Sequence, residues 1–140
     1  MIHPKMLLIG LAASQAALSA AMAAAPADAY GLWRSADDAA VIRFQECPDA
    51  AGSLCGVIVW DKDAGTPQDA CGATIARLKA FAGEAWRDGW TRDPRNGKTY
   101  RAIVRTDGDT LLLRGYIGTE VLGETERMSR TGALPEGCPR

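Results

Sequence analysis

Histidine is nearly absent from this sequence of 140 residues, because His3 is the only one. His3 lies in an N-terminal segment that we expect to be removed, which would leave the mature chain without an imidazole. Such a chain cannot use a Ser-His or Cys-His nucleophile, a histidine-ligated zinc ion or an imidazole base at neutral pH. We therefore expect no metal site and no cofactor.

An excess of charge of one sign is lacking as well. The 16 Lys and Arg nearly balance the 17 Asp and Glu, and the formal net charge is -1. Nucleic-acid binding proteins need clustered positive charge to neutralise phosphates, and this composition offers no such footprint. We expect no nucleic-acid partner. The chain length also leaves room for only one domain.

Residues 1–25 have the organisation of a secretory signal peptide. Lys5 precedes the apolar stretch MLLIGLAA, which is followed by the small-residue tract SAAMAAA. Ala21-Met22-Ala23 is the best small-x-small cleavage site, so we expect 1–23 to be a signal peptide and 24–140 to be the single mature domain. A retained membrane anchor is the alternative, but polar residues interrupt the stretch and alanine is weakly lipophilic. We predict a periplasmic or secreted protein with no stable membrane span.

The mature chain keeps all four cysteines, Cys47, Cys55, Cys71 and Cys138. In an exported chain an even number of cysteines implies disulfide bonds, although four cysteines allow three connectivities. A redox-active pair is the functional alternative, but the spacing does not resemble C-x-x-C. We expect all four cysteines to be structural.

Segments rich in β-branched and aromatic residues recur along the mature chain with turn residues between them. The turns include CPDAAGS after Glu46, DPRNG at 93–97 and TDGD at 106–109. The predicted strands are 31–35, 39–44, 55–61, 85–91, 98–105, 110–118 and 123–130.

A hairpin centred on Ala51 would make one face of its two strands wholly apolar. The predicted cross-strand pairs are Ile42 with Trp60, Phe44 with Ile58, and Cys47 with Cys55. The same register allows a cross-strand disulfide between Cys47 and Cys55, and it leaves Cys71 to pair with Cys138. The second bridge would tie the C-terminal tail to the segment that contains Cys71.

The segment 68–81 lacks the period of two that marks a half-buried strand. It instead spaces Cys71, Ile75 and Leu78 at intervals of three and four residues, which predicts a short helix. An irregular loop with one helical turn is the alternative, because Gly72 weakens a helix.

These elements predict a mainly β fold of seven or eight short antiparallel strands and one short helix. The strands are joined by short loops in sequence order, and no long Greek-key return is visible. We therefore predict a small up-and-down barrel of the lipocalin or calycin kind, with a β-sandwich as the alternative.

Five runs of residues in this order resemble the bacterial exported family of domain of unknown function 2147. They are GLWR at 31–34, CGVIVW at 55–60, DPRNGKTY at 93–100, RGYIG at 114–118 and GETERMSR at 123–130. The resemblance implies an exported lipocalin-like barrel of unassigned biochemical role, with no catalytic residues. Two departures are Met128, where the family usually has tryptophan, and a segment between residues 62 and 86 that is shorter than usual.

The opening Gly31-x-Trp33 and the late Arg130 also resemble the wider lipocalin and fatty-acid-binding pattern. In that pattern the arginine covers the tryptophan at the closed end of the barrel. A cation-π contact between Trp33 and Arg130 would contribute about 0.5 to 2 kcal/mol.

The four tryptophans suggest two functions for the interior of such a barrel. They could line an apolar cavity, in which case we expect Trp33, Trp60, Trp90 and Tyr116 to touch a small apolar or amphipathic ligand while Arg130 closes the base. They could instead fill a solid core, as small barrels allow, and the protein would then be a structural or interaction module of the cell envelope. The sequence names no protein partner for that alternative.

Enzymatic chemistry has weaker support. Glu124 and Glu126 share a strand face and could divide acid and base roles, but neighbouring Arg114 and Arg127 are expected to offset their charge. The Gly97-Lys98-Thr99 run resembles the end of a phosphate loop without its first glycine or its helix. We therefore expect a protein that is not an enzyme.

Overall fold

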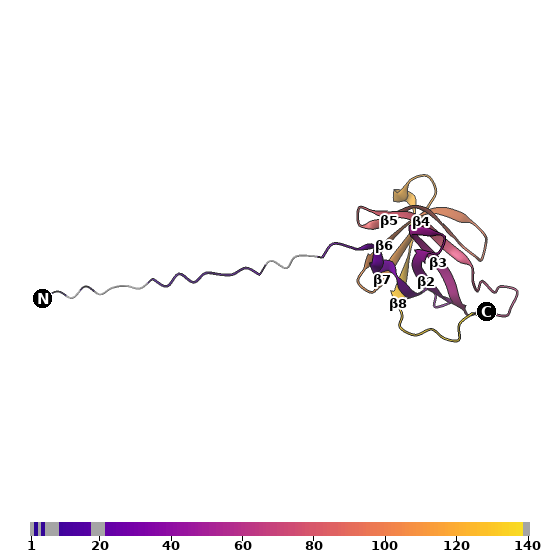
Figure 1. The fold of residues 1–140 in the computed structure, drawn as a ribbon, viewed down its shortest axis with the longest axis horizontal. Helices are drawn as coiled ribbons and strands as arrows, with labels where there is room; N and C mark the ends of the chain where they lie inside the picture. Colours follow the sequence, from indigo (N-terminus) through magenta and orange to yellow (C-terminus); the bar gives the residue numbers. More distant parts are fainter. Residues whose placement is uncertain (1, 3, 5–8, 18–21, 139–140) are drawn as a thin grey trace.

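The computed structural model describes residues 2, 4, 9–17 and 22–138. The predicted signal peptide, 1–23, includes Lys5, His3 and Ala21, which lie outside the described residues. The described part of this segment runs away from the folded body without helix or strand (Figure 1). Among the described residues, no helix has the length and apolarity needed to cross a membrane.

The folded body is a closed barrel in which every strand pairs antiparallel with its neighbours in sequence (Figure 1). Its eight strands are β1 (Gly31–Arg34), β2 (Ala40–Cys47), β3 (Ala50–Asp61), β4 (Thr74–Ala82), β5 (Ala85–Arg92), β6 (Thr99–Asp107), β7 (Thr110–Tyr116) and β8 (Glu124–Arg130). The circle is closed between β1 and β8, where Trp33 pairs with Arg130. The predicted up-and-down barrel is confirmed, and the sandwich alternative is wrong.

The alternation of side chains along the strands explains the core. On β6 and β7, Ala102, Val104, Leu111 and Leu113 recur at every second position and are all buried. Met128 of β8 joins them and is only 1% exposed. This interior row forms one continuous cluster with Trp33, Phe44, Leu54 and Leu78.

The predicted helix at 68–81 is wrong. Residues 74–82 form β4, which pairs with β3 and β5, and the only helical turns in the described residues are the short 3-10 segments Pro26–Ala29 and Glu120–Leu122. A register shift between Gly56 and Val57 interrupts the pairing of β3 with β4. Because of it, the adjacent Ile75 and Ala76 are both buried, and this local break in alternation produced the helix-like spacing.

The predicted hairpin register is also wrong, although the disulfide that it suggested is present. Ile42 pairs with Ile58 and Phe44 pairs with Gly56, because β2 and β3 contain two bulges and turn more tightly than expected. A Cβ atom on Gly56 would lie 2.7 Å from the Phe44 ring, so the ring covers bare backbone there.

Both predicted disulfide bonds are confirmed. Cys47 is bonded to Cys55 with a Cα–Cα distance of 5.0 Å, and Cys71 is bonded to Cys138 with a Cα–Cα distance of 5.4 Å. The second bond holds the C-terminal tail against the loop between β3 and β4. The amide of Cys138 also donates to the carbonyl of Val59 at 2.8 Å.

Candidate functional site

One end of the barrel is packed shut around Trp33. This side chain is fully buried, and its Nε1 donates to the carbonyl of Ala29 at 2.9 Å. The guanidinium carbon of Arg130 lies 4.1 Å from the centre of the Trp33 ring. Arg130 also donates to the carbonyls of Tyr30 at 3.0 Å and Asp28 at 2.8 Å, so the cation-π contact expected from the resemblance is present and also holds the N-terminal 3-10 turn.

The other end of the barrel is hollow and open. A cavity of about 1670 Å³ occupies it, which exceeds the size typical of sites for small molecules. Its apolar surface comes from side chains that point inward from five strands, namely Ile42, Ile58, Ile75, Leu113 and Met128. The loops β1–β2, β3–β4, β5–β6 and β7–β8 form its mouth, whereas the 3-10 turn Pro26–Ala29 and the other three hairpins lie at the packed end.

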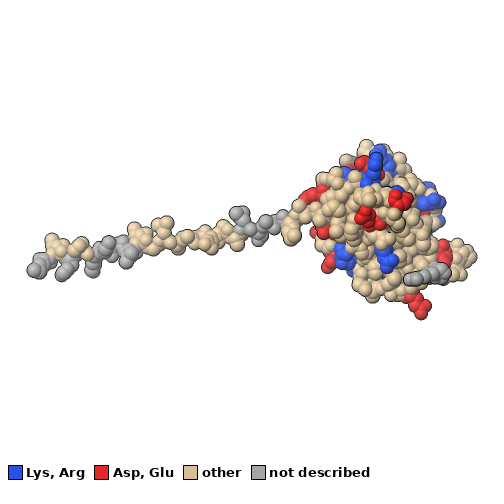
Figure 2. Space-filling view, viewed as in Figure 1, with Lys and Arg blue, Asp and Glu red and all other residues tan. Residues whose placement is uncertain are grey.

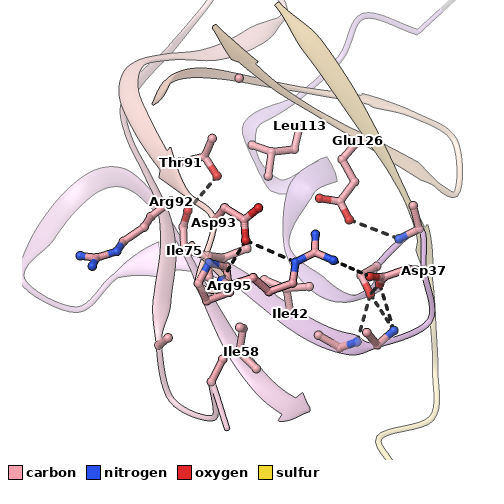
Figure 3. Close-up of a pocket in the computed structure, with 18 of the residues that line it drawn as sticks. Asp37, Ile42, Ile58, Ile75, Thr91, Arg92, Asp93, Arg95, Leu113 and Glu126 are labelled. Carbon is pink, nitrogen blue, oxygen red and sulfur yellow. Dashed lines mark hydrogen bonds and ion pairs between the residues drawn. The ribbon is translucent and has the colours of Figure 1, made fainter. Parts of the chain in front are cut away.

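The mouth carries a chain of ionic contacts centred on Arg95 of the β5–β6 loop (Figure 3). The Arg95 Nη1 atom lies 3.3 Å from Asp37, which belongs to the β1–β2 loop, and its Nε atom lies 3.4 Å from Asp93. Asp93 and Asp37 raise the pKa of Arg95, with Asp93 the larger influence. The Ser35 hydroxyl donates to Asp37 at 2.8 Å and is the main cause of the lowered pKa of that carboxyl group.

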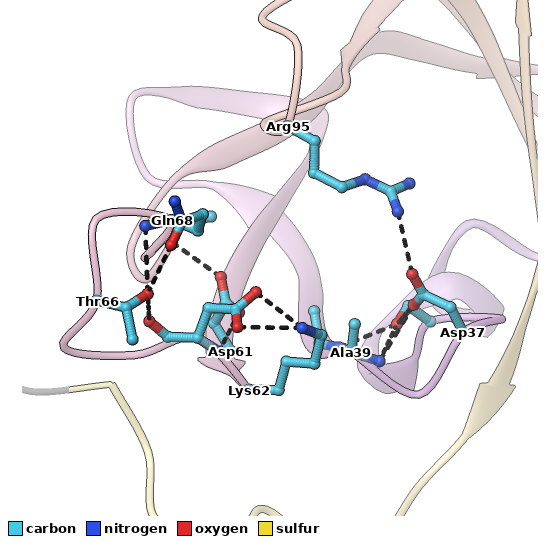
Figure 4. Close-up of polar contacts among 11 residues, drawn as sticks. Asp37, Ala39, Asp61, Lys62, Thr66, Gln68 and Arg95 are labelled. Atoms are coloured by element: carbon cyan, nitrogen blue, oxygen red, sulfur yellow. Dashed lines mark hydrogen bonds and ion pairs between the residues drawn. The ribbon is translucent and has the colours of Figure 1, made fainter.

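The loop between β3 and β4 is held by its own acidic side chains (Figure 4). Asp61 is buried and accepts from the amides of Asp63 at 2.9 Å and Ala70 at 2.8 Å. Lys62 donates to Asp63 at 2.9 Å, which raises the Lys62 pKa. Asp69 accepts from two loop amides, which lower its pKa. These contacts give the loop a fixed shape beside the cavity.

Glu126 is a carboxylate on the inner wall of the cavity. It lies two positions before Met128 on β8, and therefore on the same face of the strand. One of its oxygens accepts from the Ala36 amide at 3.3 Å, and within the described part of the chain Glu126 takes part in no ion pair. Burial raises the Glu126 pKa, and the charges of Asp37 and Asp93 add to this effect while Arg95 opposes it.

The structure does not bring the five expected ligand-binding residues together. Tyr116 lines the cavity, whereas Trp33 and Arg130 form the packed base at the opposite end. Trp60 and Trp90 do not line the cavity.

The positions of Trp60 and Trp90 follow from strand register. Trp60 pairs with Val41 beyond a bulge, and Trp90 pairs with Arg77 and Arg101. Another register shift, with Asp88 at φ 59°, separates Trp90 from Trp86, so Trp86 is 3% exposed while Trp90 is half-buried. Trp86 and Trp90 therefore differ in burial although they are four positions apart on one strand, where regular alternation would place them on the same face.

Sequence reasoning missed the charged mouth, including Arg95, Asp37 and Asp93. Asp93 and Arg95 were interpreted only as part of the DPRNG turn, and Asp37 was assigned no role. The available signal was topological, because every second loop of an up-and-down barrel lies at the same end and the polar side chains of these loops can meet there.

Among the described residues, no group of His, Cys, Asp and Glu side chains is arranged to hold a metal ion. Figure 2 shows both signs of charge interspersed over the viewed face.

An eight-stranded antiparallel barrel with one packed end and one open cavity defines a lipocalin-like protein. The chain belongs to the family described as "Uncharacterized protein conserved in bacteria (DUF2147)", whose profile matches residues 31–130. Its fold is similar to a solved structure from Helicobacter pylori, described as protein HP1028, which "belongs to the lipocalin family". The two share 15% sequence identity with a TM-score of 0.55, over 74% of this chain and 83% of that chain. No curated protein matched the sequence.

Proposed function

We propose that this protein is exported and binds a small amphipathic molecule without covalent chemistry, in the open half of its barrel. The observation that carries the proposal is the cavity of about 1670 Å³, with an apolar floor beneath a charged mouth. Such a division matches a ligand with an apolar chain and a polar head, because each part of the ligand meets surface of its own kind.

Export is supported by two independent features. The N-terminal segment has the composition of a signal peptide. The folded domain has two disulfide bonds, which persist in oxidising compartments and are rare in the cytosol. The periplasm or the cell exterior is therefore the proposed location.

Binding is a better proposal than catalysis for this cavity. Glu124, the potential partner of Glu126 in acid and base roles, is exposed at the rim, outside the enclosed setting in which two carboxylates divide such roles. Tyr116 is the one residue of the expected ligand-binding set that lines the cavity, and we propose it as a ligand contact.

Titration of the exported, oxidised protein with the neutral dye N-phenyl-1-naphthylamine tests the proposal. We expect a saturable rise in dye fluorescence. Ala40 lines the cavity and is partly buried, so Ala40→Phe should fill space and weaken dye binding. Ala51→Phe makes the same change at an exposed position of β3 outside the lining and should leave dye binding unchanged. Absence of saturable binding to the unaltered protein would refute the proposal.

An envelope interaction module is the second candidate, and one observation favours it. Ile117, Val121 and Leu122 are 75%, 84% and 79% exposed on the segment that joins β7 to β8. Ile117 and Leu122 also line the mouth of the cavity. Apolar side chains grouped at a rim are typical of contact surfaces. Cross-linking from position 121 in intact cells, with loss of the product when Leu122→Ser is added, would support this candidate.

A further inference from the structure

The cavity has a strong imbalance of charge. Among the described residues, seven carboxylates and only three basic side chains line it. The carboxylates are those of Asp37, Asp61, Asp63, Asp69, Asp93, Glu124 and Glu126, and the basic side chains are those of Lys62, Arg92 and Arg95. The whole sequence is almost neutral, so this excess of negative charge belongs to the cavity rather than to the protein in general. Walls of low dielectric constant strengthen such a local field.

Two of the three basic groups are already engaged by carboxylates. Lys62 is paired with Asp63 at 2.9 Å, and Arg95 is paired with both Asp37 and Asp93. The third, Arg92, has its guanidinium beside the turn at Gly97, and Figure 3 shows it directed away from Glu126 and Arg95. An incoming carboxylate or phosphate would therefore compete with existing partners for its counter-charge.

Glu126 is in the opposite situation, because its carboxylate forms no ion pair with any cationic side chain that the structure describes. Figure 3 shows its carboxylate group directed into the cavity, near the apolar side chain of Leu113. A positively charged ligand atom would supply the missing partner for Glu126 where its chain could rest on Leu113 and Met128. Tyr100 also lines this cavity, and an aromatic ring is a favourable neighbour for an ammonium group, whereas the Tyr116 ring already lies 5.7 Å from the guanidinium carbon of Arg101.

From these three observations we propose that the cavity selects an amphiphile with a cationic head group, such as an alkylammonium, and discriminates against alkyl carboxylates. The ammonium lies at Glu126 and the alkyl chain lies over the apolar floor. This inference rests on the proposed carrier function and specifies its ligand class.

Three amphiphiles with the same dodecyl chain test the inference. They are dodecyltrimethylammonium, a neutral dodecyl oligo(ethylene glycol) ether and dodecanoate, each used below its micellar concentration to displace bound N-phenyl-1-naphthylamine at pH 7. We expect the cation to bind about tenfold more tightly than dodecanoate, as one added ion pair allows. The neutral ether should fall between them.

Glu126→Gln removes the charge with almost no change of shape. The variant should lose about tenfold in affinity for dodecyltrimethylammonium and keep its affinity for the neutral ether. The matched control is Glu84→Gln, which removes an exposed carboxylate from the β4–β5 turn at the packed end of the barrel. This control should leave all three affinities unchanged.

The outcomes separate the two levels of the proposal. If dodecanoate binds as well as the cation, or if Glu126→Gln leaves cation affinity unchanged, the head-group assignment is overturned while the carrier function stands. An equal loss of affinity for the cation and for the neutral ether in Glu126→Gln would likewise overturn the assignment, because it would indicate damage to the cavity. If neither the dye nor any of the three amphiphiles binds, the carrier function itself fails.

Discussion

Arg130 and Trp33 are cross-strand partners at the seam of the barrel, and the guanidinium carbon of Arg130 lies 4.1 Å from the centre of the Trp33 ring. The two residues come from the first and last strands, so their contact joins the ends of the folded chain. Arg130 also reaches two carbonyl groups of the N-terminal 3-10 turn region. The Arg130 side chain therefore connects the β1–β8 junction, the buried Trp33 and the N-terminal 3-10 turn.

Arg130→Ala should lower the free energy of unfolding by about 2 kcal/mol, because it removes a cation-π contact and two hydrogen bonds. Urea denaturation followed by tryptophan fluorescence measures the change. Arg127→Ala is the matched control, since Arg127 is exposed on the same strand and its side chain makes no hydrogen bond or ion pair with the described residues. Equal stability of the two variants would contradict this account of the seam.

The two disulfide bonds should differ in their contribution to stability. Cys71 and Cys138 are separated by 67 positions, whereas Cys47 and Cys55 are separated by 8. In the chain-entropy model the longer loop contributes about 4 kcal/mol and the shorter about 2.5 kcal/mol. The double variant Cys71→Ser/Cys138→Ser should therefore unfold at lower urea concentration than Cys47→Ser/Cys55→Ser. The reverse order would show that the tail bond constrains the unfolded chain less than its separation suggests.

Glu126 should make stability depend on pH in a defined direction. Burial raises the pKa of Glu126 in the folded protein, so the native state holds this proton more tightly than the unfolded chain does. The ionised carboxylate therefore costs stability above the folded-state pKa, and the cost disappears below the ordinary value of 4.5. Glu126→Gln should be more stable than the unaltered protein at pH 7.

The measurement for Glu126 is a series of thermal melts from pH 7 down to pH 4. Asp37, Asp93 and Arg95, which surround Glu126 at the mouth, are present in both the variant and the parent. The difference between the two proteins therefore isolates Glu126. The stability advantage of Glu126→Gln should shrink as the pH falls. An advantage that grew instead would contradict the raised pKa of Glu126.

Tyr116 should matter for ligand binding more than the outer tryptophans do. Tyr116 lines the cavity, and Tyr116→Ala should lower affinity for the neutral dye by about three- to tenfold, in line with the loss of one aromatic contact. Trp60→Ala and Trp90→Ala change side chains outside the lining and should leave dye affinity unchanged. A larger loss for Trp60→Ala or Trp90→Ala than for Tyr116→Ala would relocate the binding site.

The sequence was sufficient to predict the barrel, because regular alternation of residues such as Leu111 and Leu113 marks strands, and short turns join them in order. It failed where bulges break alternation. The adjacent buried residues Ile75 and Ala76 mimicked a helix, and the bulges in β2 and β3 displaced the predicted partner of Phe44. Bulges depend on how neighbouring strands twist and close, and that information is not local in sequence.

The site was predicted less well than the fold. Aromatic residues were expected inside, yet strand register places Trp90 among the outer arginines Arg77 and Arg101. The inner carboxylate Glu126 was noted only as a possible acid or base. Its true setting depends on Arg95 and Asp37, which are far apart in sequence and meet across the mouth.

Arg95 and Asp37 come from loops on opposite sides of the barrel, four strands apart in a ring of eight. Their ion pair therefore spans the mouth of the cavity from one side to the other. Under the proposed carrier function, a ligand would have to break this contact on entry and on release, and its exchange would be slower than diffusion into an unobstructed cavity. Because this contact is an exposed ion pair that salt screens, higher ionic strength would then shorten the residence time of the ligand.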